Sequence, residues 1–491
     1  MNYYNQLIKK AKTFFDLNQF DSAKNCLLNI LDNFELNLPS KSNLYLLLAD
    51  VNSKLNNFKD TNDYFLKYLE INPNNPTVLN SIANNYSKIR QYKKAEEYYL
   101  KAINLKADYD TAIINLALLF DNLGNKLDAL RLYKKALKIN PNNLAVLFNM
   151  YKLEKKILDE KNITLVKKYL DSNNQDFFNI ASGYFLLADN ESKKKKIKNE
   201  IFFLQKANNF SFRSREKTNQ QALNYWLNII PKKFDNFTFT KNPKNSEVTK
   251  NFNPIFIVGL PRSGSTLTET IISSSKNNIL SFGESNLVNW SLLNTHRKFL
   301  FNDNPKVELD IDLIKNKLLN SYKNLFYNEK NQEIKFIDKS LENFYYINLI
   351  LKIFPNAKFI HTYRNLEDNI FSIYKEFLHK ISWSHSFDNI FSYIDNYLKV
   401  IDSIKTKYSK NVMSVSLEEL TAYPKDISKH IYQFCNLEWD ENCLNFQKRK
   451  NLYSSTASNN QIRAGIQSYN NKKYENYRFL INNYKSKYEW L

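Results

Sequence analysis

Small residues recur at a fixed spacing among bulky apolar residues in the first part of the chain. Two series have a step of 34 residues, and the second follows the first by 12 residues: Ala49, Ala83 and Ala117 form the first series, and Thr61, Ala95 and Ala129 form the second. Two helices that approach each other closely leave room only for Ala, Ser, Gly or Thr where they touch. The pattern therefore predicts repeated pairs of helices.

A unit of 34 residues with small residues at two helix contacts resembles the tetratricopeptide repeat. Ala11 and Ala23 keep the spacing of 12 residues, so four units are predicted over about residues 3–144. Asn-Pro-Asn-Asn segments at 72–75 and 140–143 separate helices. Residues 1–144 are thus predicted to form an all-α superhelix, with a non-repeating helical bundle as the alternative interpretation.

Residues 145–245 keep apolar residues at helical spacing but lose the 34-residue register. We expect this stretch to be a helical connector that caps the repeat array and joins it to the rest of the chain. Asp235–Asn253 is polar and contains Pro243, so it is predicted to be the linker before the next domain.

Strand-like and helix-like segments alternate in residues 254–491, the last predicted domain. Short apolar runs at 255–258, 334–338, 358–362 and 412–417 predict strands. Helical periodicity begins at Ser265 after the first run and covers 342–353, 366–379 and 427–435 after the others. This alternation favours an α/β fold in which helices cover both faces of a parallel sheet. In such sheets ligands bind beyond the carboxyl ends of the strands.

The turn between the first strand and its helix, residues 259–266, reads Gly-Leu-Pro-Arg-Ser-Gly-Ser-Thr. A glycine turn that leads into a helix presents backbone N–H groups to an anion, and the helix dipole favours negative charge there. The pattern is close to the phosphate loop G-x-x-x-x-G-K-[ST], except that Ser265 replaces the lysine and Arg262 supplies a cation inside the loop. Lys339 and Arg364 follow the next two strands, at the same edge of the predicted sheet.

This loop, together with a downstream Arg-x-x-x-Asp-x-x-x-Ser segment at residues 364–372, resembles the sulfotransferase family, whose donor is 3′-phosphoadenosine 5′-phosphosulfate (PAPS). Three features resemble the tyrosylprotein branch of that family: the arginine in the loop, the Gly283-Glu284 pair, and the segment Thr-Ala-Ser-x-x-Gln-x-Arg at residues 456–463. Tetratricopeptide arrays fused ahead of such domains form a recognisable bacterial group. The resemblance therefore implies a P-loop-type sulfotransferase domain behind the repeats.

The resemblance also implies a role for each matched residue. The implied catalytic residues are Glu284 as general base, Arg262 on the sulfuryl or phosphate oxygens, Lys339 at the bridging oxygen, and Ser458. The implied donor-binding residues are Pro261, Arg262, Ser263, Gly264, Ser265 and Thr266 of the loop, Arg364 and Ser372 at the 3′-phosphate, and Arg463 in a late loop that closes over the nucleotide. Asp368 is expected to orient Arg364 or to cap a helix. A glutamate with a pKa of about 4.3 is a weak base, so burial or neighbours are expected to raise the pKa of Glu284.

The resemblance thus implies transfer of a sulfuryl group from PAPS to an acceptor hydroxyl by in-line displacement, and no metal is expected where cations and N–H groups stabilise the leaving phosphate. Peptidyl tyrosine is suggested as the acceptor by the branch and by the positive charge of the chain, while carbohydrate and small-molecule hydroxyls stay open. The array is expected to bind either a protein acceptor or a second subunit. A second copy of this chain, forming a homodimer, is one such subunit. Two alternatives belong to other classes: a P-loop kinase or ATPase, in which Asp338 imitates the acid of a Walker-B strand, and a non-catalytic repeat scaffold.

Composition narrows the class of protein further. The formal net charge is +21, but lysine and asparagine are abundant everywhere and arginines do not cluster with aromatic residues, so no nucleic-acid partner is expected. The three cysteines have no metal-ligand spacing, which suits a reducing cytosol, and no uncharged apolar run is long enough to span a membrane. We therefore expect a cytoplasmic location. His361 lies inside a predicted strand and is expected to be a hydrogen-bonded core residue.

Overall fold

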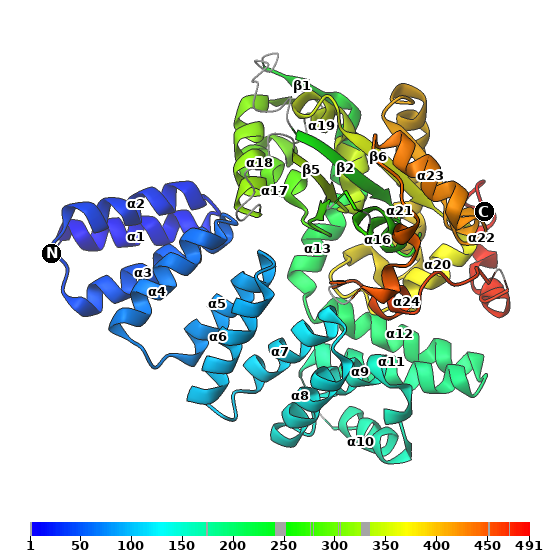
Figure 1. Ribbon diagram of the computed structural model, residues 1–491, viewed down its shortest axis with the longest axis horizontal. Coiled ribbons are helices and arrows are strands. Elements are labelled where there is room, and N and C mark those ends of the chain that lie inside the picture. The colour runs from blue at the N-terminus through cyan, green and yellow to red at the C-terminus, as the bar shows by residue number, and fades with distance from the viewer. Residues whose placement is uncertain are drawn as a thin grey trace.

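The computed structural model describes residues 2–491 apart from 173–174, 241–251, 275, 278, 303, 305, 326–333, 450–451 and 471. Helices alone build the N-terminal part, and a parallel sheet with helices on both faces builds the C-terminal part (Figure 1). This arrangement confirms the predicted fold class. Much of the predicted linker lies outside the described residues.

The repeat array consists of four pairs of consecutive helices. They are α1 (Asn2–Asp16) with α2 (Phe20–Asn33), α3 (Leu38–Lys54) with α4 (Phe58–Ile71), α5 (Pro76–Lys88) with α6 (Tyr92–Leu105), and α7 (Asp110–Leu123) with α8 (Lys126–Ile139). All six small residues of the two 34-residue series have no exposed surface. The spacing in the sequence therefore reports real contacts between the paired helices.

The stretch predicted as a connector is helical and shares a core with the sheet domain. Its helices are α9 (Leu144–Leu153), α10 (Glu160–Leu170), α11 (Phe177–Lys193), α12 (Ile197–Arg213), α13 (Glu216–Asn224) and α14 (Ile230–Lys233). Phe185 of α11 and Leu204 of α12 belong to the same buried cluster as Phe256 of the central strand. Packing is thus continuous from the connector into the sheet domain.

Among the described residues, five parallel strands form the main sheet, in the order β3 (Leu280–Ser281), β5 (Ile334–Asp338), β2 (Phe252–Gly259), β6 (Lys358–Tyr363) and β7 (Val412–Ser416). Alternate residues of β2 face opposite sides, as strand geometry requires. Phe256 and Val258 pack with α17 (Leu287–Leu300), α18 (Ile311–Leu325), α19 (Ile347–Ile353) and α21 (Phe387–Lys407). Ile255 and Ile257 pack with α16 (Ser265–Ser273) and α23 (Pro424–Phe434).

Some element boundaries differ from the predictions. Phe237–Phe239, inside the predicted linker, forms β1, which pairs with β4 (Val307–Leu309) and buries Phe237. The predicted helix 342–353 begins as a 3-10 turn over Leu341–Tyr346. The predicted helix 366–379 ends early as α20 (Leu366–Tyr374), and the chain then turns so that Phe377 packs on Phe185. The last predicted helix starts three residues earlier, at Pro424, because proline suits the first turn of a helix.

Candidate active site

The anion loop joins β2 to α16 through backbone conformations that few residues adopt. Gly259 has φ 139°, and a Cβ at this position would lie 2.3 Å from the carbonyl oxygen of Thr362 in the neighbouring strand. Gly264 has φ 92° at the N-terminal boundary of α16, and Arg262 has φ 68° although it carries a side chain. Such strain in a non-glycine residue concentrates at ligand sites. The loop therefore directs the N-terminus of α16 toward a cavity lined by Pro261, Arg262, Gly264, Ser265 and Thr266.

Ser263 has a structural place in the loop. Its side chain is buried, donates a hydrogen bond to the carbonyl oxygen of Leu260 at 2.7 Å, and shares a hydrogen bond of 2.8 Å with the hydroxyl of Thr362. It does not line the cavity. The Ser263 hydroxyl thus holds the loop against β6 instead of facing a ligand.

Arg262 brings together three segments that are far apart in the sequence. Its guanidinium donates to Ser372 Oγ on α20 at 3.3 Å and to Ser458 Oγ at 2.8 Å. Glu376 Oε2 lies 3.6 Å away and supplies a counter-charge. The predicted catalytic and 3′-phosphate residues are therefore neighbours around one arginine, and both serines line the same cavity.

Arg364 is buried with an unused donor. Its two terminal nitrogens donate to the carbonyl oxygen of Arg262 at 3.3 Å and to the hydroxyl of Tyr469 at 2.9 Å, while its Nε has no hydrogen-bond partner. Asp368 lies 3.7 Å from the guanidinium and accepts a hydrogen bond from Tyr469. A buried guanidinium N–H without a partner is costly, and a phosphate oxygen is the type of acceptor that would satisfy it. The site thus suits a phosphate group.

Lys339 and Glu284 form an ion pair in the same region. Lys339 Nζ lies 2.8 Å from Glu284 Oε1 and 3.7 Å from Glu269 Oε2, and the lysine has no exposed surface. Glu284 lines the cavity, and its side chain is 56% exposed. The positive charge of Lys339 lowers the pKa of Glu284, so the expectation of a raised pKa is wrong. The carboxylates around Lys339 in turn raise the pKa of the lysine against the effect of its burial.

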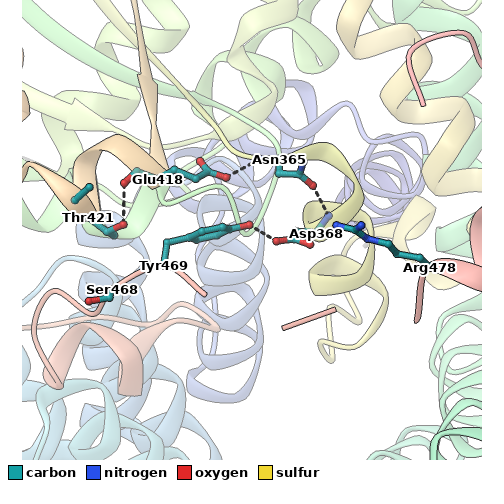
Figure 2. Close-up of a pocket in the computed structure, with 8 residues that line it drawn as sticks. Asn365, Asp368, Glu418, Thr421, Ser468, Tyr469 and Arg478 are labelled. Atoms are coloured by element: carbon teal, nitrogen blue, oxygen red, sulfur yellow. Dashed lines mark hydrogen bonds between the residues drawn. The ribbon is translucent and has the colours of Figure 1, made fainter. Parts of the chain in front are cut away.

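The cavity has a volume of about 1760 Å³, and the repeat array forms one of its walls. Leu118 and Asp121 of α7 and Phe148 and Lys152 of α9 face the same space as Glu284. A smaller pocket of about 710 Å³ adjoins this cavity. In Figure 2, which draws the residues of the smaller pocket, the Tyr469 hydroxyl points at Asp368. Tyr469 lines both spaces.

Arg463 lies elsewhere than the resemblance implied. It does not line the cavity, and its guanidinium donates to the carbonyl oxygens of Asn122 in α7 at 2.7 Å and of Leu452 at 2.8 Å. The resemblance placed Arg463 near the nucleotide, in the same late loop as Ser458. The helix α24 (Asn459–Arg463) turns them in different directions, Ser458 to Arg262 and Arg463 to the repeats.

Sequence reasoning missed two residues of the site, Tyr469 and Glu342. Glu342 lines the cavity, its charge interacts with that of Glu284, and burial raises its pKa to about 7. Its place three residues after Lys339, at the carboxyl end of a strand, is the signal that could have identified it. Tyr469 lies in a stretch without periodicity, so no local pattern indicates it.

His361 is a buried strand residue that hydrogen-bonds Ser414 and Tyr397, as expected, and burial lowers its pKa to about 3. Within the described part of the chain, no cluster of histidine, cysteine and acidic residues could hold a metal ion. Of the helices described, none combines the length and apolar character needed to cross a bilayer.

Comparison with known proteins places two kinds of module in the chain. Residues 254–441 match the model of the sulfotransferase family, and residues 76–109 and 111–143 match models of the tetratricopeptide repeat. An uncharacterized protein of Aquifex aeolicus (strain VF5) is 30% identical over 236 residues, which are 46% of this chain and 30% of that relative. The chain thus matches less than a third of the length of this curated relative.

Solved structures give distant likenesses. The sulfotransferase domain from the Synechococcus PCC 7002 olefin synthase is 19% identical, covers 48% of this chain and 90% of its own, and has a TM-score of 0.32. A tetratricopeptide repeat protein from Parabacteroides merdae ATCC 43184 is 17% identical, covers 44% of this chain and 93% of its own, and also has a TM-score of 0.32. Together with the strands, the loop and the repeats described above, the family matches show that this chain consists of tetratricopeptide repeats followed by a sulfotransferase-family domain.

Proposed function

We propose that this chain transfers the sulfuryl group of PAPS to an acceptor hydroxyl. The observation that carries the proposal is the convergence of Arg262 with Ser372 and Ser458 beside an anion loop, in a cavity that Glu284 also lines. Sulfuryl transfer needs positive charge and N–H donors where negative charge develops, and a base for the acceptor proton. The cavity offers these groups together.

The reaction proposed is a displacement at sulfur. The acceptor oxygen forms a new bond to sulfur while the bond from sulfur to the bridging oxygen breaks, and the electron pair of that bond stays on the leaving phosphate. Arg262, Lys339 and the N–H groups of the loop would stabilise the negative charge on this phosphate. Glu284 would accept the proton of the acceptor hydroxyl, because its pairing with Lys339 keeps it ionised.

The donor's 3′-phosphate would bind at Arg364 and Ser372. Arg364 Nε is buried without a hydrogen-bond partner, and both residues line the cavity. Tyr469 and Asp368 would act indirectly, by holding the guanidinium plane in place. A bidentate arginine contact to phosphate is stronger than a contact between neutral groups.

The acceptor in this proposal is a polypeptide, with tyrosine as the sulfated residue. Small-molecule sites commonly occupy about 300–1000 Å³, and this cavity of about 1760 Å³ exceeds that range. Its array wall includes Leu118 of α7 and Phe148 of α9, so a segment bound along the inner face of the repeats would reach Glu284. Tetratricopeptide arrays form extended concave surfaces that suit such segments.

A kinase or ATPase fits the structure less well. The Asp338 carboxylate, which would play the Walker-B acid, accepts hydrogen bonds from Ser285 at 2.6 Å, Tyr322 at 2.7 Å and the Ser340 hydroxyl at 2.6 Å. It has no exposed surface and does not line the cavity. A carboxylate with these partners is a structural residue of the strand end.

The proposal is tested by incubating the full chain with PAPS and a lysate of its own host, and identifying sulfated products by mass spectrometry. We expect sulfotyrosine in proteins, much less of it when Glu284→Gln replaces the natural chain, and none when PAPS is omitted. Sulfated carbohydrate without sulfotyrosine would contradict the proposal that the acceptor is a tyrosine of a polypeptide. Nucleotide turnover that requires ATP and magnesium, with no sulfated product, would contradict the reaction itself.

A further inference from the structure

One segment of the sheet domain, residues 452–463, connects the repeat array to the anion loop; we call it the bridging segment. On the array side, Asn459 Nδ2 donates to the backbone oxygen and to Oδ1 of Asp121, each at 3.2 Å. Arg463 and the backbone N–H of Ser454 both donate to the carbonyl oxygen of Asn122, at 2.7 and 3.0 Å. Figure 1 shows α24 lying between the sheet domain and the helices α7 and α9.

Two further contacts extend this attachment. Asn460 Nδ2 donates to the carbonyl oxygen of Lys152 in α9 at 2.7 Å. The rings of Tyr453 and Tyr92 stack with centroids 4.6 Å apart, which ties the segment to α6. The bridging segment therefore contacts α6 and α7 of the array and α9 of its cap.

The end of α7 is built to accept this attachment. The last carbonyl groups of a helix have no partner within the helix and carry partial negative charge, which favours a cation. Gly124 ends α7 with φ 81°, and a Cβ there would lie 2.2 Å from Arg463 Nη1. Only glycine leaves this space, so the close approach of the guanidinium depends on a residue of the repeats about 340 positions earlier.

The other side of the bridging segment faces the anion loop. Ser458 Oγ accepts a hydrogen bond from Arg262 at 2.8 Å, and Gln461 Oε1 accepts one at 3.4 Å. Thr266 Oγ1 donates to Thr456 Oγ1 at 3.3 Å. Ser455, Thr456 and Ser458 also line the cavity next to α7. One short segment thus contacts the repeats with one side and the proposed donor site with the other.

We propose that Arg463 and Asn459 are positioning residues through which the repeat array holds Ser458 against Arg262. The array is then a structural part of the site as well as a surface for partners. The proposal rests on the proposed function only for the identity of the donor nucleotide. It assigns Arg463 to the end of α7, whereas the resemblance assigned it to the nucleotide.

Hydrogen exchange tests the attachment without any ligand. In the full chain, we expect Arg463→Ala and Gly124→Ala to accelerate exchange of the amides at 454–462 at least tenfold, with much smaller changes elsewhere in the sheet domain. Arg463→Lys, which keeps the charge, should restore part of the protection. Arg131→Ala is the control, because Arg131 is an exposed arginine of the same helix pair and pairs with Asp128 on its own helix. Unchanged exchange at 454–462 in both test variants would overturn the proposal.

A double-mutant cycle tests the link to the donor site. The probe is adenosine 3′,5′-bisphosphate, titrated into each full-length variant by calorimetry. We expect Arg463→Ala and Ser458→Ala each to weaken binding about tenfold, and the double variant to be within threefold of Ser458→Ala, because the arginine acts through the serine. If the double variant instead loses affinity by the product of the two single losses, Arg463 does not act through Ser458 and the positioning role is overturned. If the natural chain does not bind the nucleotide, the proposed function fails. The hydrogen-exchange measurement then decides by itself whether the repeat array holds the bridging segment in place.

Discussion

Lys339 Nζ lies 2.8 Å from Glu284 Oε1, and this ion pair determines the charge of both groups. The lysine is fully buried and retains its proton because Glu284 and Glu269 compensate for lost hydration. The glutamate faces the cavity and stays ionised because the lysine lowers its pKa. The pair therefore keeps a buried cation beside an ionised carboxylate that faces the cavity.

Replacing Glu284 by glutamine should slow turnover while leaving donor binding nearly intact. Glutamine keeps the size of the side chain but cannot accept the proton, so we expect kcat to fall by roughly 10²–10⁴. Steady-state rates with one sulfated acceptor, and calorimetry with adenosine 3′,5′-bisphosphate, measure the two effects separately.

Arg262→Ala and Glu438→Gln serve as comparisons for that experiment. Arg262→Ala should weaken donor binding and slow turnover together, because Arg262 contacts Ser372 of the proposed 3′-phosphate site and the proposed catalytic Ser458. Glu438→Gln removes an exposed carboxylate that pairs with Lys276, and it should change neither quantity. Turnover by Glu284→Gln within about threefold of the natural rate would place the base elsewhere.

The 3′-phosphate of the donor should contribute strongly to affinity through Arg364. Removing this phosphate, by comparing adenosine 3′,5′-bisphosphate with adenosine 5′-phosphate, should cost about 2–4 kcal/mol, because charge-assisted contacts are lost. The titration is carried out with EDTA present, since the proposed contacts involve no metal. Equal affinity for the two nucleotides would show that Arg364 has another role.

Arg364→Ala should abolish the preference for the 3′-phosphate. Arg478→Ala is a matched control, because Arg478 is a half-exposed arginine that pairs with Glu367 and lines only the smaller pocket. We expect the control to keep the full preference. A comparable loss in both variants would indicate a general effect of positive charge.

The sequence predicted the residues that follow strands, and missed contacts between distant segments. Arg262, Lys339 and Arg364 could be found because the carboxyl ends of parallel strands meet at one edge of a sheet. The contact of Arg463 with Asn122 joins two segments without a shared pattern, so no periodicity reveals it. The lowered pKa of Glu284 likewise depends on a three-dimensional neighbour, Lys339.

The predicted domain boundaries illustrate the same limit. Period and composition change near residue 145 and near residue 245, which suggested separate units. Apolar residues of α11 and α12 nevertheless belong to the core of the sheet domain, and Phe237 of the predicted linker pairs in a strand. Helical spacing shows that a face is apolar but does not identify the surface that covers it.

Glu342 should make stability depend on pH. Its pKa of about 7 in the folded chain is above its ordinary value of 4.5, so the folded state binds this proton more tightly than the unfolded state. Two charged groups act on this carboxyl: Glu284 raises its pKa further, and Lys339 opposes that effect. The stability that protonated Glu342 contributes is therefore fully present below pH 4.5, and it is lost as the pH rises toward and through about 7.

Glu342→Gln tests this dependence, because glutamine resembles the protonated carboxyl. Thermal melts should show that the variant gains Tm over the natural chain at pH 8 but not at pH 5. If the proposed function is correct, the natural chain should also show a change in kcat near pH 7 that the variant lacks, since Glu284 stays ionised throughout. The same difference in Tm at both pH values would mean that Glu342 does not titrate in this range.

Two glycines beside the site, Gly259 and Gly283, separate the effect of backbone conformation from that of close packing. Both have positive φ, 139° and 57°, so alanine is strained at either position. A Cβ on Gly283 would meet its nearest atom at 3.9 Å, whereas one on Gly259 would lie 2.3 Å from the backbone oxygen of Thr362. Gly283→Ala should therefore cost about 1–2 kcal/mol of unfolding free energy, the usual cost of a left-handed conformation.

Gly259→Ala should cost clearly more, because β2 and β6 must also move apart, and it should weaken adenosine 3′,5′-bisphosphate binding by displacing the anion loop. Urea unfolding of both variants measures the first effect, and equal losses would show that φ alone, and not the contact with β6, requires glycine in the loop.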